Sequence, residues 1–83
     1  MKLPRNVSGA ELAQRLRRMG YEKTRQTGSH MRLTCNQPKE HHVTIPQHDD
    51  LRVGTLAAIL GMVADHHQMS RVALSEQLFG DRR

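Results

Sequence analysis

Hydrophobic residues recur at helical spacing near the start of the chain and predict an amphipathic helix. The apolar positions on its buried face are Leu12, Leu16 and Met19. Ser8 and Glu11 form an S-x-x-E capping box, so we expect the helix to begin at about Gly9. Gly20 stands where a left-handed residue would end it.

Two short segments on either side of a glycine have the pattern of a β-hairpin. Residues 21–26 precede Thr27-Gly28, and residues 30–35 follow this turn closely. In the second segment, apolar and polar positions alternate, which is typical of a strand with one buried face. His30 is one of the polar positions, so we expect its side chain to point away from the core.

The pairing of these two strands depends on the turn. If the loop holds only the two residues before Ser29, Arg25 lies opposite His30 and Lys23 lies opposite Arg32. Those side chains would form a basic surface around one imidazole. The same register sends Tyr21 to the open face, so a bulged turn that flips the first strand is the alternative.

The rest of the chain predicts one more strand and two more helices. Residues 41–46 alternate like a third strand, and Asp50 or Thr55 could cap the next helix. The apolar positions of that helix are Val53, Leu56, Ala57, Ile59, Leu60, Val63 and Ala64. Ser70 would start a short last helix that stops at Gly80. This order predicts an α+β fold with helices on one face of a three-stranded antiparallel sheet.

Size and composition restrict the fold to one small core. With 83 residues, of which 36% are hydrophobic, we expect a single domain over 1–83. Its core would span about 8–65, and about 66–83 would form a C-terminal extension. We do not expect an enzyme that needs a deep cleft between domains, and a surface site suits the chain better.

The positive charge is concentrated in the first half of the chain. Residues 1–39 contain nine Lys and Arg against two Glu, and residues 40–83 contain four against six acidic residues. The net charges are thus +7 and −2, and ten of the thirteen basic residues are Arg. Guanidinium groups suit phosphate oxygens, so the asymmetry favours a nucleic-acid partner over a merely solvated surface.

The lone cysteine, Cys35, excludes an intrachain disulfide and fits a reducing compartment. There is no apolar run long enough for a membrane span, and the N-terminus lacks the apolar stretch of a signal peptide. We therefore expect a cytoplasmic protein that does not associate with a membrane.

His30 is the leading candidate for chemistry, because it adjoins a glycine turn among cationic residues. Nearby positive charge favours a neutral imidazole, which could take a proton from a ribose 2′-hydroxyl. That hydroxyl would then attack the adjacent phosphorus and cut RNA without a metal. His48 is a possible second proton-transfer group, ahead of His42, but an exposed histidine on a strand is usually only a polar surface residue.

A metal site is not expected. The adjacent pairs His41-His42 and His66-His67 lack the i, i+4 spacing of helical sites, and neighbouring residues on a strand point to opposite faces. Together with Cys35 they do not make a zinc-binding pattern. The chemistry proposed for His30 requires no cofactor, and we expect none.

An ordered set of short motifs resembles the HicA (YcfA-like) mRNA interferase toxins. The set runs from about Ser8 to Val63 and departs from the family after about Asp65. Its members are Gly20-Tyr21, Arg25-Gln26, Gly28-Ser29-His30, Pro46-x-His48, Gly54-Thr55-Leu56 and Ile59-Leu60.

The resemblance implies a fold like a double-stranded-RNA-binding domain, α-β-β-β-α, and a ribonuclease toxin that cleaves mRNA. It implies neutralisation by a HicB-type antitoxin protein. The catalytic histidine of the family falls on His30, and His48 matches a recurrent family position. What the C-terminal extension contacts does not follow from the resemblance.

Three functions are consistent with these observations. The first is a metal-independent endoribonuclease that uses His30 and holds RNA through Lys23, Arg25, Ser29 and Arg32. The second is a non-catalytic RNA-binding module of the same fold, which would read A-form shape. The third is an interaction subunit whose basic face docks an acidic protein. Loss of RNA cleavage on replacing His30 separates the first from the others.

Overall fold

The computed structural model describes residues 3–81, so both ends of the predicted 1–83 domain lie outside the described residues. In chain order the elements are helix α1 (Gly9–Leu16), the 3-10 turn η1 (Arg17–Met19), strands β1 (Glu22–Thr27), β2 (His30–Cys35) and β3 (His41–Pro46), and helices α2 (Val53–His66) and α3 (Arg71–Phe79).

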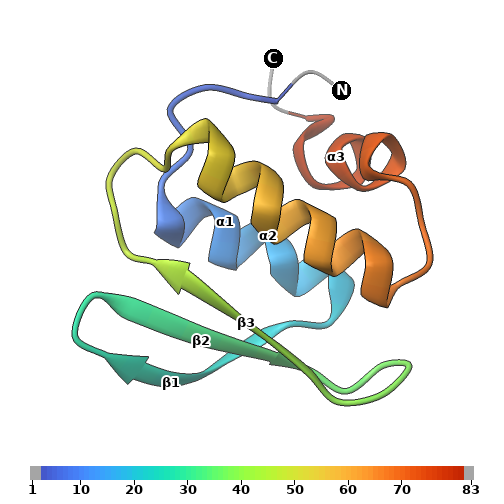
Figure 1. The fold of residues 1–83 in the computed structure, drawn as a ribbon, viewed down its shortest axis with the longest axis horizontal. Helices are drawn as coiled ribbons and strands as arrows, with labels where there is room; N and C mark the ends of the chain where they lie inside the picture. The colour runs from blue at the N-terminus through green and yellow to red at the C-terminus, as the bar shows by residue number, and fades with distance from the viewer. Residues whose placement is uncertain (1–2, 82–83) are drawn as a thin grey trace.

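The strands form one open antiparallel sheet in the order β1-β2-β3, and the helices lie together on one side of it (Figure 1). This is the α+β arrangement of a double-stranded-RNA-binding domain with one further helix, as the pattern and the family resemblance predicted. Both faces of β1 are exposed along its whole length. The sheet therefore has one covered face, one open face and an uncovered strand at its edge.

Local sequence signals account for α1. The Ser8 hydroxyl accepts a hydrogen bond from the Glu11 amide at 2.9 Å, as the capping box requires. Gly20 ends the following 3-10 turn with φ +92°, a left-handed conformation that glycine adopts at low cost. Gly9, at the first helical position, lies against the end of β3 and donates its amide proton to the His48 carbonyl at 2.9 Å.

The hairpin register differs from the expected one. Thr27 pairs with His30 and Arg25 pairs with Arg32, so the turn begins at Gly28 and not at Thr27. Gly28 has φ +56°, which suits the first central position of a two-residue hairpin turn. The turn lies one residue later than expected, so the prediction that Arg25 lies opposite His30 is wrong by two residues.

A bulge in β1 changes the pairing register of the residues before it. The register shifts between Lys23 and Arg25, and Lys23 pairs with Leu33 instead of Arg32. Tyr21 is completely buried as a result, where the expected register had placed it on the open face. Burial of this large ring favours the shifted register, and the irregularity lies within the strand rather than at the turn that we considered.

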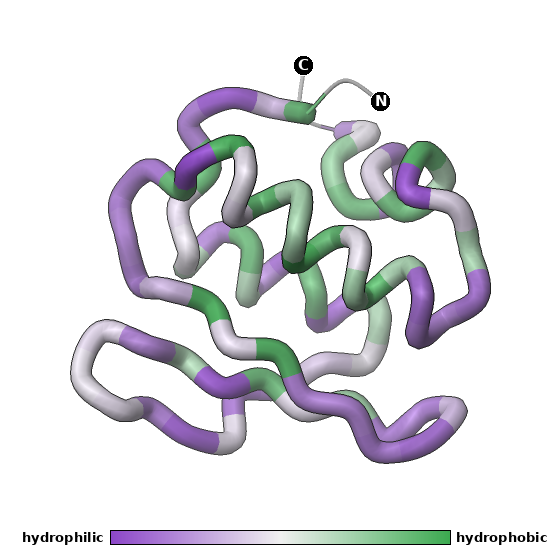
Figure 2. Tube along the Cα trace, in the orientation of Figure 1, coloured by the Kyte–Doolittle hydropathy of each residue, from purple (hydrophilic) through white to green (hydrophobic). Residues whose placement is uncertain are grey.

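The core lies between the sheet and the helices, where hydrophobic segments of strands and helices face one another (Figure 2). Its largest fully buried side chains are Tyr21, Leu12, Leu16, Leu33, Ile45, Leu56, Leu60, Leu74 and Leu78. The predicted apolar face of α2 is confirmed for most positions, but Val53 is 62% exposed. The N-cap of α2 is Arg52, whose side chain makes no capping bond, so neither Asp50 nor Thr55 has the expected role.

Helix α3 begins as predicted, because the Ser70 hydroxyl accepts a hydrogen bond from the Ala73 amide at 3.0 Å. Its C-terminal end is bound by two arginines of the α1–η1 segment. Arg15 donates to the Leu78 carbonyl at 2.8 Å and to Asp81 at 2.7 Å, and Arg18 donates to Asp81 at 3.2 Å. These hydrogen bonds lower the pKa of Asp81 from 3.8 to about 2. Arg15 and Arg18 are therefore engaged in hydrogen bonds within the fold.

Candidate active site

His30 is exposed at the start of β2, the middle strand of the sheet. Its neighbours across the sheet are Thr27 on β1 and Pro46 on β3. Because Met31 is buried against the helices, the alternation of the strand turns the His30 side chain to the open face. The prediction that this imidazole points away from the core is confirmed.

The turn that carries His30 is held from both sides by glutamines. The Ser29 carbonyl accepts a hydrogen bond from the Gln47 amide at 2.6 Å. The Gln26 side-chain amide donates to the Gly28 carbonyl at 2.9 Å and to the Gln47 side-chain oxygen at 2.6 Å. The backbone before His30 is therefore fixed by β1 and by the segment after β3.

Two guanidinium groups lie on the same open face as His30. They belong to the next cross-strand pair whose side chains point to this face, which we call one row away. Arg32 is two residues further along β2, about 7 Å away at the backbone, and Arg25 is directly opposite Arg32 on β1. Like charges in opposite positions repel each other unless an anion lies between them. No carboxylate in residues 3–81 pairs with either arginine. The geometry suits a phosphate beside the imidazole.

Lys23 lies on the other side of the strand pair, because it is opposite the inward-facing Leu33. It hydrogen-bonds Gln26 at 3.1 Å and lines a groove of about 570 Å³ between α1 and the sheet, together with Gln14 and Arg17. The structure therefore separates Lys23 from the open-face pair of arginines with which it was grouped.

The other two candidate histidines are separate from His30. His48 is exposed in the loop after β3, where its carbonyl accepts the amide proton of Gly9 at the start of α1. His42 is exposed two rows from His30 on the open face, and its Nδ1 lies 2.9 Å from the Thr34 hydroxyl. In the described part of the chain, neither histidine has an interaction with His30.

Sequence reasoning missed the glutamines that hold the turn. Gln26 and Gln47 are placed beside two of the motifs, Arg25-Gln26 and Pro46-x-His48, so they were visible as motif positions. Their structural role was not visible in the sequence, because the hydrogen bond between them joins residues 21 positions apart.

None of the helices described is long and apolar enough to cross a membrane.

Comparison with protein families identifies the chain. Residues 9–63 match the family model described as the HicA toxin of bacterial toxin-antitoxin systems. No match was found among curated proteins or among solved structures. The matched segment covers α1, the whole sheet and most of α2, and it includes His30, Arg25 and Arg32. With more than half of its length matched, the chain belongs to the HicA toxin family.

Proposed function

We propose that this HicA-family chain is an endoribonuclease that cleaves mRNA and that His30 transfers the proton in the reaction. The observation that carries this proposal is an exposed imidazole on a fixed turn, sharing one face with two arginines that have no acidic partner in residues 3–81. The separation of one row suits a single nucleotide unit that contacts both the imidazole and a guanidinium.

The chemistry requires no redox partner or cofactor. In the direction where His30 is the base, its free nitrogen takes the proton of the 2′-hydroxyl, and the oxygen attacks the adjacent phosphorus. The bond from phosphorus to the 5′-oxygen breaks, and that oxygen takes up a proton. Arg25 and Arg32 would stabilise the charge that develops on the phosphate oxygens. The products are a 2′,3′-cyclic phosphate and a 5′-hydroxyl.

The binding surface would be the open face of the sheet near the turn. Ser29 and the two arginines lie beside His30, and their contacts with phosphate would be sensitive to salt. Lys23 lines the groove by α1 and would contribute less. His48 would assist only if bound RNA brings its loop to the same face, so His30 is the residue on which the proposal depends.

Family membership implies an antitoxin partner in a toxin-antitoxin system. We propose a HicB-type protein that binds this chain with an acidic surface, since the +7 net charge of residues 1–39 favours such a partner. Induction of the chain alone should stop growth, and co-expression of the protein from the adjacent gene should restore it. Growth that continues during induction of well-folded chain would contradict the toxin function.

The decisive experiment uses purified chain and a defined transcript in the presence of a chelator. The wild-type chain should produce fragments with cyclic phosphate ends. His30→Ala should lower the rate by about 10²–10⁴-fold, the usual contribution of a proton-transfer residue. RNA binding by this variant, measured at matched salt, should remain largely intact.

His42→Ala is the matched control, because His42 is also an exposed histidine on the open face. It should retain the wild-type cleavage rate. Equal rates for the wild type and His30→Ala would refute the catalytic role of His30. Binding to the transcript without any cleavage would instead favour the non-catalytic RNA-binding module.

A further inference from the structure

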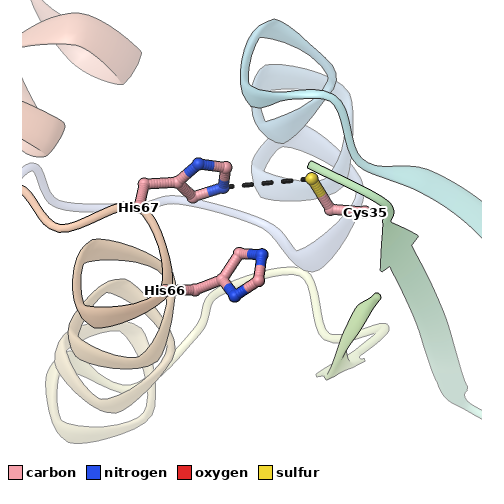
Figure 3. Close-up of side chains that lie close together, drawn as sticks. All are labelled: Cys35, His66 and His67. Atoms are coloured by element: carbon pink, nitrogen blue, oxygen red, sulfur yellow. Dashed lines mark hydrogen bonds between the residues drawn. The ribbon is translucent and has the colours of Figure 1, made fainter. Parts of the chain in front are cut away.

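A cluster of metal-ligating side chains lies at the opposite end of β2 from His30. Cys35 ends this strand, His66 ends α2, and His67 follows as the C-cap of the helix. Both imidazole rings reach toward the cysteine sulfur (Figure 3). One donor atom from each of the three residues lies within 4.8 Å of the others, and Cys35 Sγ is 3.9 Å from His67 Nε2.

A backbone oxygen supplies a fourth donor at the same place. The Gln37 carbonyl oxygen is 3.2 Å from Cys35 Sγ and 3.1 Å from His66 Nε2. In the metal-free chain it can accept a hydrogen bond from each of them. The same oxygen would be a ligand if one cation replaced the protons between these atoms.

These separations are close to those of a tetrahedral site. Zinc lies about 2.3 Å from sulfur and about 2.0–2.1 Å from nitrogen or oxygen, so adjacent donors are roughly 3.3–3.6 Å apart. The measured separations of 3.1, 3.2 and 3.9 Å lie on both sides of this range. The donor atoms of Cys35, His66 and His67 all lie within 4.8 Å of one another, so the widest pair would have to close by at most about 1.5 Å to reach tetrahedral separations.

Two buried polar atoms near the cluster support the presence of a polar ligand there. Tyr21 Oη and His41 Nε2 are buried and have no hydrogen-bond partner in the described chain. The Tyr21 ring meets the His67 ring edge-on at 5.7 Å, and the His41 ring stacks on the His66 ring at 4.1 Å. Unpaired buried polar atoms are uncommon in native proteins, and both of these belong to rings that contact the rings of His66 and His67.

Coordination needs a lone pair on each imidazole nitrogen and an unprotonated sulfur, so zinc binding would compete with protons. The Cys35 thiol would release its proton when the metal binds.

We propose that Cys35, His66 and His67, with the carbonyl oxygen of Gln37, bind a zinc ion. Zinc accepts thiolate and imidazole ligands, although two imidazoles, one thiolate and a backbone oxygen are also the ligand set of blue-copper sites. The ion would join the end of α2 to the end of β2, immediately before the segment that leads to α3. Such a site would revise our sequence-based expectation of no metal, which considered the spacing of the histidines and the two faces of a strand but not contacts between distant segments.

The site is independent of the proposed RNA cleavage. Cys35 and His30 are at opposite ends of a six-residue strand, about 17 Å apart, so the ion would not contact RNA at His30. His66 and His67 also lie beyond residues 9–63, the segment matched by the HicA family. The zinc would therefore stabilise a feature of this chain's own C-terminal part.

The test uses the full chain without a purification tag, stripped of metal by a chelator and then titrated with zinc against a competing indicator. One zinc per chain should bind, and the Tm should rise by about 10 °C or more at zinc about 100-fold above Kd. Cobalt should produce the charge-transfer absorption of a thiolate ligand. Absence of stoichiometric zinc binding would overturn the proposal.

Variants separate a built site from surface binding. His67→Gln and Cys35→Ser should each lower zinc affinity by at least about 100-fold, and zinc should no longer raise their Tm. His42→Gln is the matched control, because His42 is outside the cluster and should bind zinc like the wild type. Since Cys35 is buried, circular dichroism of each metal-free variant establishes that it folds. Equal zinc affinity in all four chains would mean adventitious binding and refute the site.

Discussion

Replacing Gly9 with alanine tests whether the close approach of α1 to the end of β3 constrains the fold. A Cβ atom at Gly9 would lie 2.0 Å from the Pro46 carbonyl oxygen and 3.2 Å from the Gln47 Cα, both backbone atoms. Ordinary contacts begin at 3.4 Å, so the start of α1 and the end of β3 would have to separate by about 1.4 Å. That movement would also stretch the bond from the Gly9 amide to the His48 carbonyl.

The size of the effect follows from these contacts. Overpacking against rigid backbone costs about 1–3 kcal/mol, and loss of the hydrogen bond costs about 0.5–1.5 kcal/mol. The better helix propensity of alanine returns up to about 1 kcal/mol. Gly9→Ala should therefore lower the free energy of unfolding by about 1–4 kcal/mol, which is a fall in Tm of roughly 5–25 °C.

Gly54→Ala is the matched control, since it makes the same substitution in the first turn of α2. A Cβ at Gly54 meets no atom within 4 Å, so this variant should be as stable as the wild type or more stable by about 0.4–1 kcal/mol. Urea and thermal unfolding followed by circular dichroism measure both changes. If Gly9→Ala is as stable as Gly54→Ala, the close approach of α1 to β3 does not constrain the fold.

Other predictions concern the charged groups. Nuclear magnetic resonance titration of the Asp81 carboxyl should give a midpoint of about 2, and Arg15→Gln should move it toward 3.8. Because folding lowers this pKa, the contribution of Asp81 to stability is present above about pH 3.8 and is lost as the pH falls toward 2. An acid-unfolding midpoint that is unchanged in Arg15→Gln would contradict this contribution. Arg25→Ala and Arg32→Ala should each reduce the salt dependence of RNA binding by about 0.7 in log–log slope, measured by fluorescence anisotropy. Lys23→Ala should have a smaller effect, and an equal one would mean that RNA also contacts the groove beside α1.

Local signals predicted those parts of the fold that depend on neighbouring residues. The cap at Ser8, the left-handed Gly20 and the cap at Ser70 each act within one helical turn, so their residue types indicated their positions. The alternation of β2 likewise predicted which side His30 faces. In each case the physical cause lies within a few residues of its effect.

The parts that could not be predicted depend on distant contacts. The bulge after Lys23 exists because it lets Tyr21 into a core formed by β2 and α2, and no pattern inside β1 indicates this. The N-cap of α2 at Arg52 also lacks a local signal. Cys35 and His67 come together from segments 32 positions apart, and a spacing rule for metal sites does not detect such a cluster.

For the candidate active site, the sequence predicted which face the residues share better than it predicted their pairing across the strands. His30, Arg25 and Arg32 share the open face as expected, but Arg25 lies opposite Arg32, two residues along β2 from its expected partner His30. The sequence motifs named the right turn, because its glycine is required by a local backbone conformation. The orientation of Lys23 depended on the bulge and could not be deduced without it.

Arg15 and Arg18 are hydrogen-bonded to the C-terminal end of α3. The net charge counted from the sequence therefore overstates the attraction of the folded chain for polyanions. Two of the nine cations in residues 1–39 are occupied by Asp81 and by carbonyl groups. If α3 and Asp81 detached from α1, Leu78 would become exposed and the guanidinium groups of Arg15 and Arg18 would be released at the same time. Fraying of the C-terminus would therefore increase nonspecific binding to RNA, because the same equilibrium controls both.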